Sequence, residues 1–121
     1  MARRSWTSVR VEFLDRDKAV RSLRQAAKRL RQTHPQVEQV ILFGSLEKGD
    51  YVPGSDADIL LILEADPRPF LQRIPEFRRH FLDSPVDVEV FPYTRDEVAR
   101  GQADPSSFIH SVMTGPLEVL A

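Results

Sequence analysis

The chain has 121 residues, of which 41% are hydrophobic and 29% charged, and it contains no cysteine. Such a chain has the length and composition of one globular domain, and the lack of cysteine excludes disulfides, thiolate metal sites and cysteine nucleophiles. The longest apolar run, residues 59–63, is far shorter than the ~20 residues of a membrane-spanning helix. No apolar segment follows Arg3 and Arg4, as it would in an export signal, so we expect a cytoplasmic protein without membrane association.

The net charge of −1 conceals an uneven distribution of charge along the chain. Residues 1–40 carry ten Lys or Arg against four Asp or Glu, whereas residues 41–121 carry seven against fourteen. A basic segment of this kind is typical either of a nucleic-acid contact or of a solvated helix, and an acidic segment can bind cations. We favour the solvated helix and keep nucleic-acid binding through this segment as the less favoured alternative.

The first half of the chain is predicted to form three strands, two of them inner strands, and one amphipathic helix. Alternating apolar residues predict a strand over residues 8–14, before the others. After Asp15, a candidate N-cap, apolar residues recur every three or four positions and predict a helix that ends near Gln32, ahead of Pro35. Short apolar runs predict two strands buried on both faces, at residues 39–43 and 58–64.

The second half is predicted to alternate helices and strands. Pro75 should kink or split a helix over residues 67–82, and a strand with an acidic face follows at residues 85–91. Thr94 and Glu97 form a capping box that begins a short helix ending at Gly101. A last helix at 106–114 and a terminal strand at 117–120 complete the order β-α-β-β-α-β-α-α-(β). This order predicts an α/β (α+β) fold with a mixed β-sheet backed by helices.

Three polar groups fall where the predicted strands end or face outward: Gly44-Ser45, Asp56 with Asp58, and Asp87 with Glu89. Each alone is most often a turn, a cap or a solvated strand face. Side chains two positions apart on a strand point the same way, so each acidic pair should converge. Two carboxylate pairs on adjacent strands repel one another unless a divalent cation lies between them.

The chemistry of these groups indicates a nucleotide site. Carboxylate oxygens suit Mg²⁺, with Mn²⁺ as an alternative, and such ions complete their shell with water and substrate phosphates. A Gly-Ser turn at a strand end lets backbone N–H groups approach an anion without an intervening Cβ. A metal on one side and a phosphate cradle on the other predict a nucleoside triphosphate site.

The run Leu42-Phe43-Gly44-Ser45, ten intervening residues and then Asp56-Ala57-Asp58 resembles the minimal nucleotidyltransferases of the DNA polymerase β-like superfamily. Their signature is Gly-Ser, ten residues and Asp-x-Asp. Lys48-Gly49 stands where such sequences commonly have Arg-Gly, and Val86-Asp87-Val88 resembles the later strand that carries a third carboxylate. Leu46 and Glu47 depart from the pattern, in the loop that would contact phosphates. The resemblance leaves residues 1–14 outside as an arm or strand and makes 15–121 a single minimal nucleotidyltransferase domain.

The resemblance implies the nucleotidyltransferase fold and a Mg²⁺-dependent transfer of AMP, or another NMP, from ATP to a hydroxyl acceptor. The implied catalytic residues and metal ligands are Asp56, Asp58 and Asp87. The implied nucleotide-binding residues are Gly44, Ser45, Lys48 and Ser55. Glu89 faces the same way as Asp87 on the predicted strand, and its part in metal binding is left open.

The resemblance also implies a partner. Minimal members are commonly paired with a small helical protein of the HEPN type, in which they act as antitoxins that adenylylate a tyrosine of the toxin. The alternative is a non-catalytic, nucleotide-binding antitoxin that neutralises its partner by binding. Small-molecule nucleotidylation is a third interpretation, disfavoured because the chain is expected to lack a domain that encloses such an acceptor. A homo-oligomer is left open.

Overall fold

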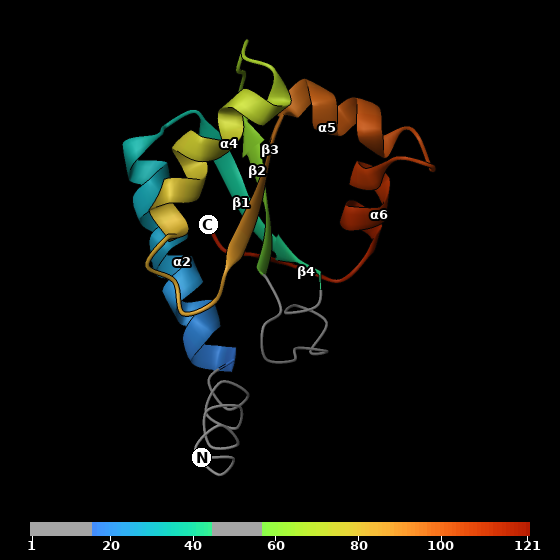
Figure 1. Cartoon of the computed structure of the whole chain (residues 1–121). Helices are drawn as coiled ribbons and strands as arrows, with labels where there is room; N and C mark the ends of the chain where they lie inside the picture. The colour runs from blue at the N-terminus through green and yellow to red at the C-terminus, as the bar shows by residue number, and fades with distance from the viewer. Residues whose placement is uncertain (1–15, 45–56) are drawn as a thin grey trace.

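The computed structural model describes residues 16–44 and 57–121 of the chain (Figure 1). The predicted strand at residues 8–14 lies outside them. In chain order the elements are α2 (Arg16–Thr33), β1 (Val37–Phe43), β2 (Ala57–Leu63), α4 (Phe70–Arg78), the 3₁₀ turn η1 (Arg79–Phe81), β3 (Val88–Thr94), α5 (Arg95–Gln102), α6 (Phe108–Thr114) and β4 (Leu117–Val119).

The strands form one mixed sheet in the order β3-β2-β1-β4. β1 pairs antiparallel with both β2 and β4, while β2 pairs parallel with β3. The prediction that β1 and β2 are inner strands is confirmed, and so is the mixed α/β fold. Every residue of β2 except Asp58 is buried, as expected of a strand covered on both faces.

Helices cover both faces of the sheet (Figure 1). α2 and α4 lie on one face, where Leu23, Leu30 and Phe77 pack against Leu61 and Val90 in the larger apolar cluster. α5 and α6 lie on the other face. There Val98, Ile109 and Val112 pack against Ile41, Phe43, Leu60 and Ile62. Strand residues alternate between the two faces of a sheet. Asp58, two positions before Leu60 on β2, therefore lies on the face that α5 and α6 cover.

The third strand differs from its predicted position. It was expected at residues 85–91 but spans Val88–Thr94, because residues 82–86 form turns and bends after η1. Pro92 does not end the strand, since β3 is an edge strand and a residue whose backbone faces outward needs no N–H. Asp87 therefore precedes the strand instead of lying within it.

The second helix also differs from expectation. It begins at Phe70, directly after Pro69, and continues through Pro75 without being split there. The tightening into the 3₁₀ turn η1 comes only after Arg78. The predicted capping box is confirmed, because the Thr94 side chain accepts from the Glu97 N–H and the Glu97 side chain accepts from the Thr94 N–H.

Arg73 ties α4 to the end of β3 and to α5. Its side chain is buried, and its guanidinium donates to both carboxylate oxygens of Glu97 at 2.7 and 3.1 Å. It also donates to the carbonyl oxygens of Pro92, Arg68 and Asp66 at 3.0, 2.9 and 3.3 Å. The Arg73 guanidinium lowers the pKa of Glu97, so the pair is ionised at neutral pH. One side chain thus satisfies three carbonyls and a carboxylate.

Replacing Arg73 by Met should lower the free energy of unfolding by roughly 3 kcal/mol, because breaking a buried ion pair leaves its partner groups unsatisfied. The matched control is Arg95→Met, since Arg95 makes a similar pair with Glu38 at the surface, where such pairs contribute about 1 kcal/mol or less. Urea unfolding of both variants measures the difference. Equal losses would contradict the assigned role of Arg73.

Two histidines meet between α2 and η1. His34 Nε2 lies 3.1 Å from His80 Nε2, and the buried His34 ring contacts Phe77 edge-on, with 5.2 Å between the ring centroids. Burial of the His80 side chain, and next the proximity of His34, lower the pKa of His80 below 6.5. The folded protein therefore binds the His80 proton less readily than the unfolded chain does.

The lowered pKa of His80 predicts a loss of stability in mild acid. Stability from this site is complete above pH 6.5 and is lost as the pH falls through the pKa of the folded state. We expect the free energy of unfolding to fall as the pH drops below about 6.5, and His80→Asn to reduce that slope. Urea titrations at several pH values measure it, and an unchanged slope in the variant would rule out His80 as the cause.

Candidate active site

The chain leaves β1 through a residue that must be glycine. Gly44 has φ +85°, a backbone conformation that other residues rarely adopt. A Cβ built on Gly44 would also overlap Asp58 Oδ2 and come within 3.3 Å of Asp58 Cγ. The glycine is thus required twice, by its backbone angle and by the Asp58 carboxylate that lies against it.

Asp58 is the polar exception in an apolar strand. It is the second residue of β2, is half-buried, and pairs in register with Phe43 of β1 on one side. On its other side the register partner is Glu89 of β3. Residues paired in register project to the same face of a sheet, so Asp58 and Glu89 lie on the face that α5 and α6 cover in part.

Asp87, the predicted third carboxylate, lies at the start of this pairing. Its side chain is exposed, and its carbonyl oxygen accepts from the Ala57 N–H at 2.7 Å. Sequence reasoning placed Asp87 in the site and left the part of Glu89 open, and the parallel register pairs Glu89 with Asp58. The alternation of Val86, Val88 and Val90 indicated which face these acids share, yet only the register shows which one faces Asp58.

The remaining predicted site residues, Ser45, Lys48, Ser55 and Asp56, lie outside the described residues. Over residues 16–44 and 57–121, no group of three or more His, Asp or Glu side chains is arranged to hold a metal ion. One of the three predicted metal ligands, Asp56, lies outside the described residues, so the structure describes only Asp58 and Asp87 of this set. Among the residues described, Asp58 and Glu89 offer carboxylate oxygens, the donors that Mg²⁺ prefers, and so they fit such an ion.

Aromatic side chains border the acidic pair on the same face. The ring of Phe91 lies 5.6 Å from that of Phe43 and 5.2 Å from that of Phe108, centroid to centroid. Beside them a cleft of about 260 Å³ is lined by Phe43, Gly44, Phe108, Ser111, Val112, Gly115 and Pro116. Phe108 is 42% exposed although it lies among other rings, and it lines this cleft together with Gly44.

The basic surface of α2 is separate from this site. α2 covers the opposite face of the sheet from Asp58 (Figure 1). Two of its arginines are engaged within the domain: Arg24 pairs with Glu118, and Arg31 donates to the Val37 carbonyl at 3.2 Å. This favours a structural role for these two arginines. In the part of the chain that the structure describes, no helix is both long and apolar enough to span a membrane.

Comparisons with known proteins agree with this geometry. The sequence model of the nucleotidyltransferase domain family matches residues 23–108, which is more than half of the chain. The chain therefore belongs to the nucleotidyltransferase domain family. A solved structure from Sulfolobus solfataricus, described as a candidate nucleotidyltransferase, has the same fold with a TM-score of 0.57 and 23% identity. The match covers 71% of this chain and 76% of that one. No curated protein sequence matches the chain.

The contact between Gly44 and Asp58 predicts a non-additive pair of mutations. Gly44→Ala should lower the free energy of unfolding by about 1–2 kcal/mol through its backbone conformation alone, and by more through overlap with the Asp58 carboxylate. In an Asp58→Ala background the overlap is gone and only the conformational cost is left. Urea unfolding of the two single variants and the double variant measures the coupling, and strictly additive losses would contradict the contact.

Proposed function

We propose that the protein transfers AMP, or another NMP, from a nucleoside triphosphate such as ATP to a hydroxyl group of a partner protein. Its family supports nucleotidyl transfer in general. The observation that carries the proposal is the contact of Gly44 with the Asp58 carboxylate at the adjoining ends of β1 and β2. It supports a site in which the Gly-Ser motif would bind phosphate beside Asp58 as a metal ligand. Glu89 adds a second carboxylate beside them.

The proposed reaction is a single displacement at the α-phosphorus of the nucleoside triphosphate. The acceptor oxygen forms a bond to the α-phosphorus, and the bond from that phosphorus to the oxygen bridging to the β-phosphate breaks. Pyrophosphate leaves with the electron pair of that bond. The hydroxyl proton passes to a carboxylate, for which Asp87 is the candidate, and from there to solvent.

The protein's part in this reaction is mainly to align the reactants and balance their charge. Asp58 and Glu89, with Asp56 by the sequence motif, would hold Mg²⁺. When bound, the ion offsets negative charge on the phosphates. Gly44 leaves the turn without a side chain, so that backbone N–H groups there can approach a phosphate. Asp58, fixed in the sheet by its register with Phe43 and Glu89, is a rigid ligand.

The cleft next to Gly44 suits the nucleoside. It is lined by Gly44 on one side and by the exposed ring of Phe108 on another. A base stacked on an aromatic ring gains roughly 1–3 kcal/mol and needs no particular hydrogen-bonding pattern. The sequence resemblance supports a tyrosine of a small helical HEPN-type toxin as the acceptor, which would make the protein an antitoxin that acts by adenylylation.

The test replaces Asp58 by Asn, which keeps the size of the side chain and removes its charge. We expect calorimetry to show tighter ATP binding with Mg²⁺ than with a chelator, and the Asp58→Asn variant to lose that difference. Transfer of labelled AMP to a HEPN-type protein encoded beside this one should fall about 100-fold or more. Asp83→Asn, at an exposed position between η1 and β3, is the control.

Three outcomes separate the possible functions. Loss of label transfer in Asp58→Asn but not in Asp83→Asn supports the enzyme. Metal-dependent ATP binding with no mass increase on the partner favours an antitoxin that acts by binding alone. If Asp58→Asn binds and transfers as the wild type does, the proposed site is wrong.

A further inference from the structure

The solvent side of α2 carries several cations without a counter-charge. Its exposed basic side chains include Lys18, Arg21, Lys28 and Arg29. Within residues 16–44 and 57–121, no ion pair or hydrogen bond engages the charged groups of these four side chains. The acidic residue of this helix, Asp17, pairs instead with Arg16, at 3.6 Å. The four cations therefore differ from Arg24 and Arg31, which are bonded within the domain.

A fifth cation joins this surface from a distant part of the chain. Arg79 is exposed on η1, which packs against α2 where His34 meets His80. The pKa of His80 is lowered by burial, by His34 and also by the positive charges of Arg79 and Arg29. Both guanidinium groups thus lie near the same imidazole. We call Lys18, Arg21, Lys28, Arg29 and Arg79 together the basic face.

The cations of the basic face form two groups along α2. Lys18 and Arg21 lie about one turn apart near the start of the helix, and Lys28 and Arg29 lie near its end, on the side of Arg79. At a rise of about 1.5 Å per residue, the centres of the two groups are about 14 Å apart along the helix axis. Gln25, exposed and uncharged, lies between them.

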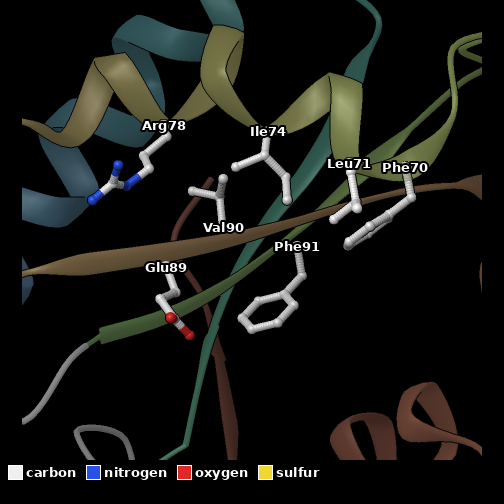
Figure 2. A pocket seen from close by; sticks show the side chains of 7 residues that line it. All are labelled: Phe70, Leu71, Ile74, Arg78, Glu89, Val90 and Phe91. Atoms are coloured by element: carbon white, nitrogen blue, oxygen red, sulfur yellow. The ribbon is translucent and has the colours of Figure 1, made fainter.

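The basic face lacks the apolar surface that a protein partner or a membrane would need. Large apolar side chains that are exposed in the described residues are Leu71, Leu82, Phe108 and Val119. None of these four lies on α2, and only Leu82 borders η1. Leu71 lines a groove of about 400 Å³ between α4 and β3, where its side chain is directed toward the strand (Figure 2).

Protein interfaces bury an apolar centre, and helices that bind membrane surfaces insert an apolar face. The apolar face of α2 is already buried in the core of the domain. Phosphate groups, by contrast, are bound by Arg and Lys side chains without any apolar contact. The chemistry of the basic face therefore favours a nucleic acid.

The absence of exposed aromatic rings favours a double helix over a single strand. Proteins hold single strands by stacking the bases on aromatic side chains. α2 contains no aromatic residue, and Phe81 of η1 is buried. The exposed ring of Phe108 belongs to α6, on the other face of the sheet.

We propose that the basic face binds the phosphate backbone of a DNA double helix without reading its sequence. The major groove of B-DNA is about 12 Å wide, so cation groups about 14 Å apart can reach phosphates on both of its rims when α2 lies across it. The corresponding groove of an RNA double helix is narrow and deep, which favours DNA. Contacts to phosphate position a protein but carry no sequence information.

This inference does not rest on the proposed function. α2 covers the opposite face of the sheet from Asp58, so DNA on the basic face leaves the candidate active site open. Binding of DNA and binding of Mg²⁺-ATP should therefore be independent of each other.

The test measures binding of the full chain to a labelled DNA duplex of about 20 base pairs, or two helical turns, by fluorescence anisotropy at several salt concentrations. Each phosphate contact contributes about −0.9 to the slope of log K against log salt, so five contacts predict a slope of about −4.5. Two duplexes of unrelated sequence should bind equally. Saturating Mg²⁺-ATP should leave both affinities unchanged.

Two exposed arginines provide matched variants. Arg21→Gln removes one charge from the basic face, whereas Arg100→Gln removes one from α5 on the other face of the sheet. Glutamine is a good helix former, so both variants should unfold at nearly the same urea concentration as the wild type. Arg21→Gln should weaken binding of both duplexes and make the slope shallower by about 1, and Arg100→Gln should change neither.

Other results would overturn the proposal and identify what binds instead. Equal effects of the two variants, or binding that does not depend on salt, would exclude the basic face as the site. Tighter binding of one strand of the duplex alone would indicate a single-stranded ligand. Arg21-dependent binding of polyglutamate or of phosphatidylserine vesicles, but not of the duplex, would indicate an acidic protein or a membrane.

The two proposals of function fail separately. Displacement of the duplex by Mg²⁺-ATP would assign DNA binding to the candidate active site and overturn its assignment to the basic face. If the duplex does not bind but Asp58-dependent binding of Mg²⁺-ATP persists, the DNA proposal is wrong and the proposed function stands. If the duplex binds through Arg21 while Asp58→Asn leaves ATP binding unchanged, the proposed active site is wrong and the DNA proposal stands.

Discussion

The parallel pairing of β2 with β3 is the interaction on which the rest of this structure depends. A parallel pair cannot be joined by a tight turn and needs a crossover, which here runs through α4 and η1. The crossover helix carries Arg73, whose guanidinium satisfies carbonyls on both sides of it and reaches the capping box of α5. The helix that makes the pairing possible is thus bonded to the strand that it delivers.

The same pairing sets the chemistry of the site. A shift of one residue in its register would turn Glu89 to the other face and place a valine beside Asp58. The shift is opposed by the apolar side chains of Val88 and Val90, which are buried against α2 and α4 on the face away from Glu89. The packing of the core therefore fixes the register of Asp58 and Glu89. The half-buried Asp58 carboxylate lowers the stability of β2, and the burial of the other residues of this strand offsets that loss.

Features encoded by local sequence could be predicted, whereas those set by tertiary contacts could not. The periodicity of α2, the apolar runs of β1 and β2, and the capping box of Thr94 and Glu97 each follow from nearby residues. β3 was predicted three residues too early because the tolerance of Pro92 depends on its position at the sheet edge. The Gly-Ser motif indicated Gly44, but the Asp58 carboxylate that requires it becomes visible only in the fold. One feature of the sequence is consistent with the burial of Arg73, because Arg73 lies among the apolar positions Phe70, Ile74 and Phe77.

The two faces of the sheet are linked by the geometry of β3. In β3 the odd-numbered residues direct their backbone to β2 and their side chains to the face of Asp58, while the even-numbered ones direct their backbone outward and their side chains to α2 and α4. Glu89 and Val90 are consecutive, so the residue in register with Asp58 is joined directly to one that is buried in the core. The position of Glu89 beside Asp58 is therefore set by the packing of the core, and it could change only if the pairing of β2 and β3 changed.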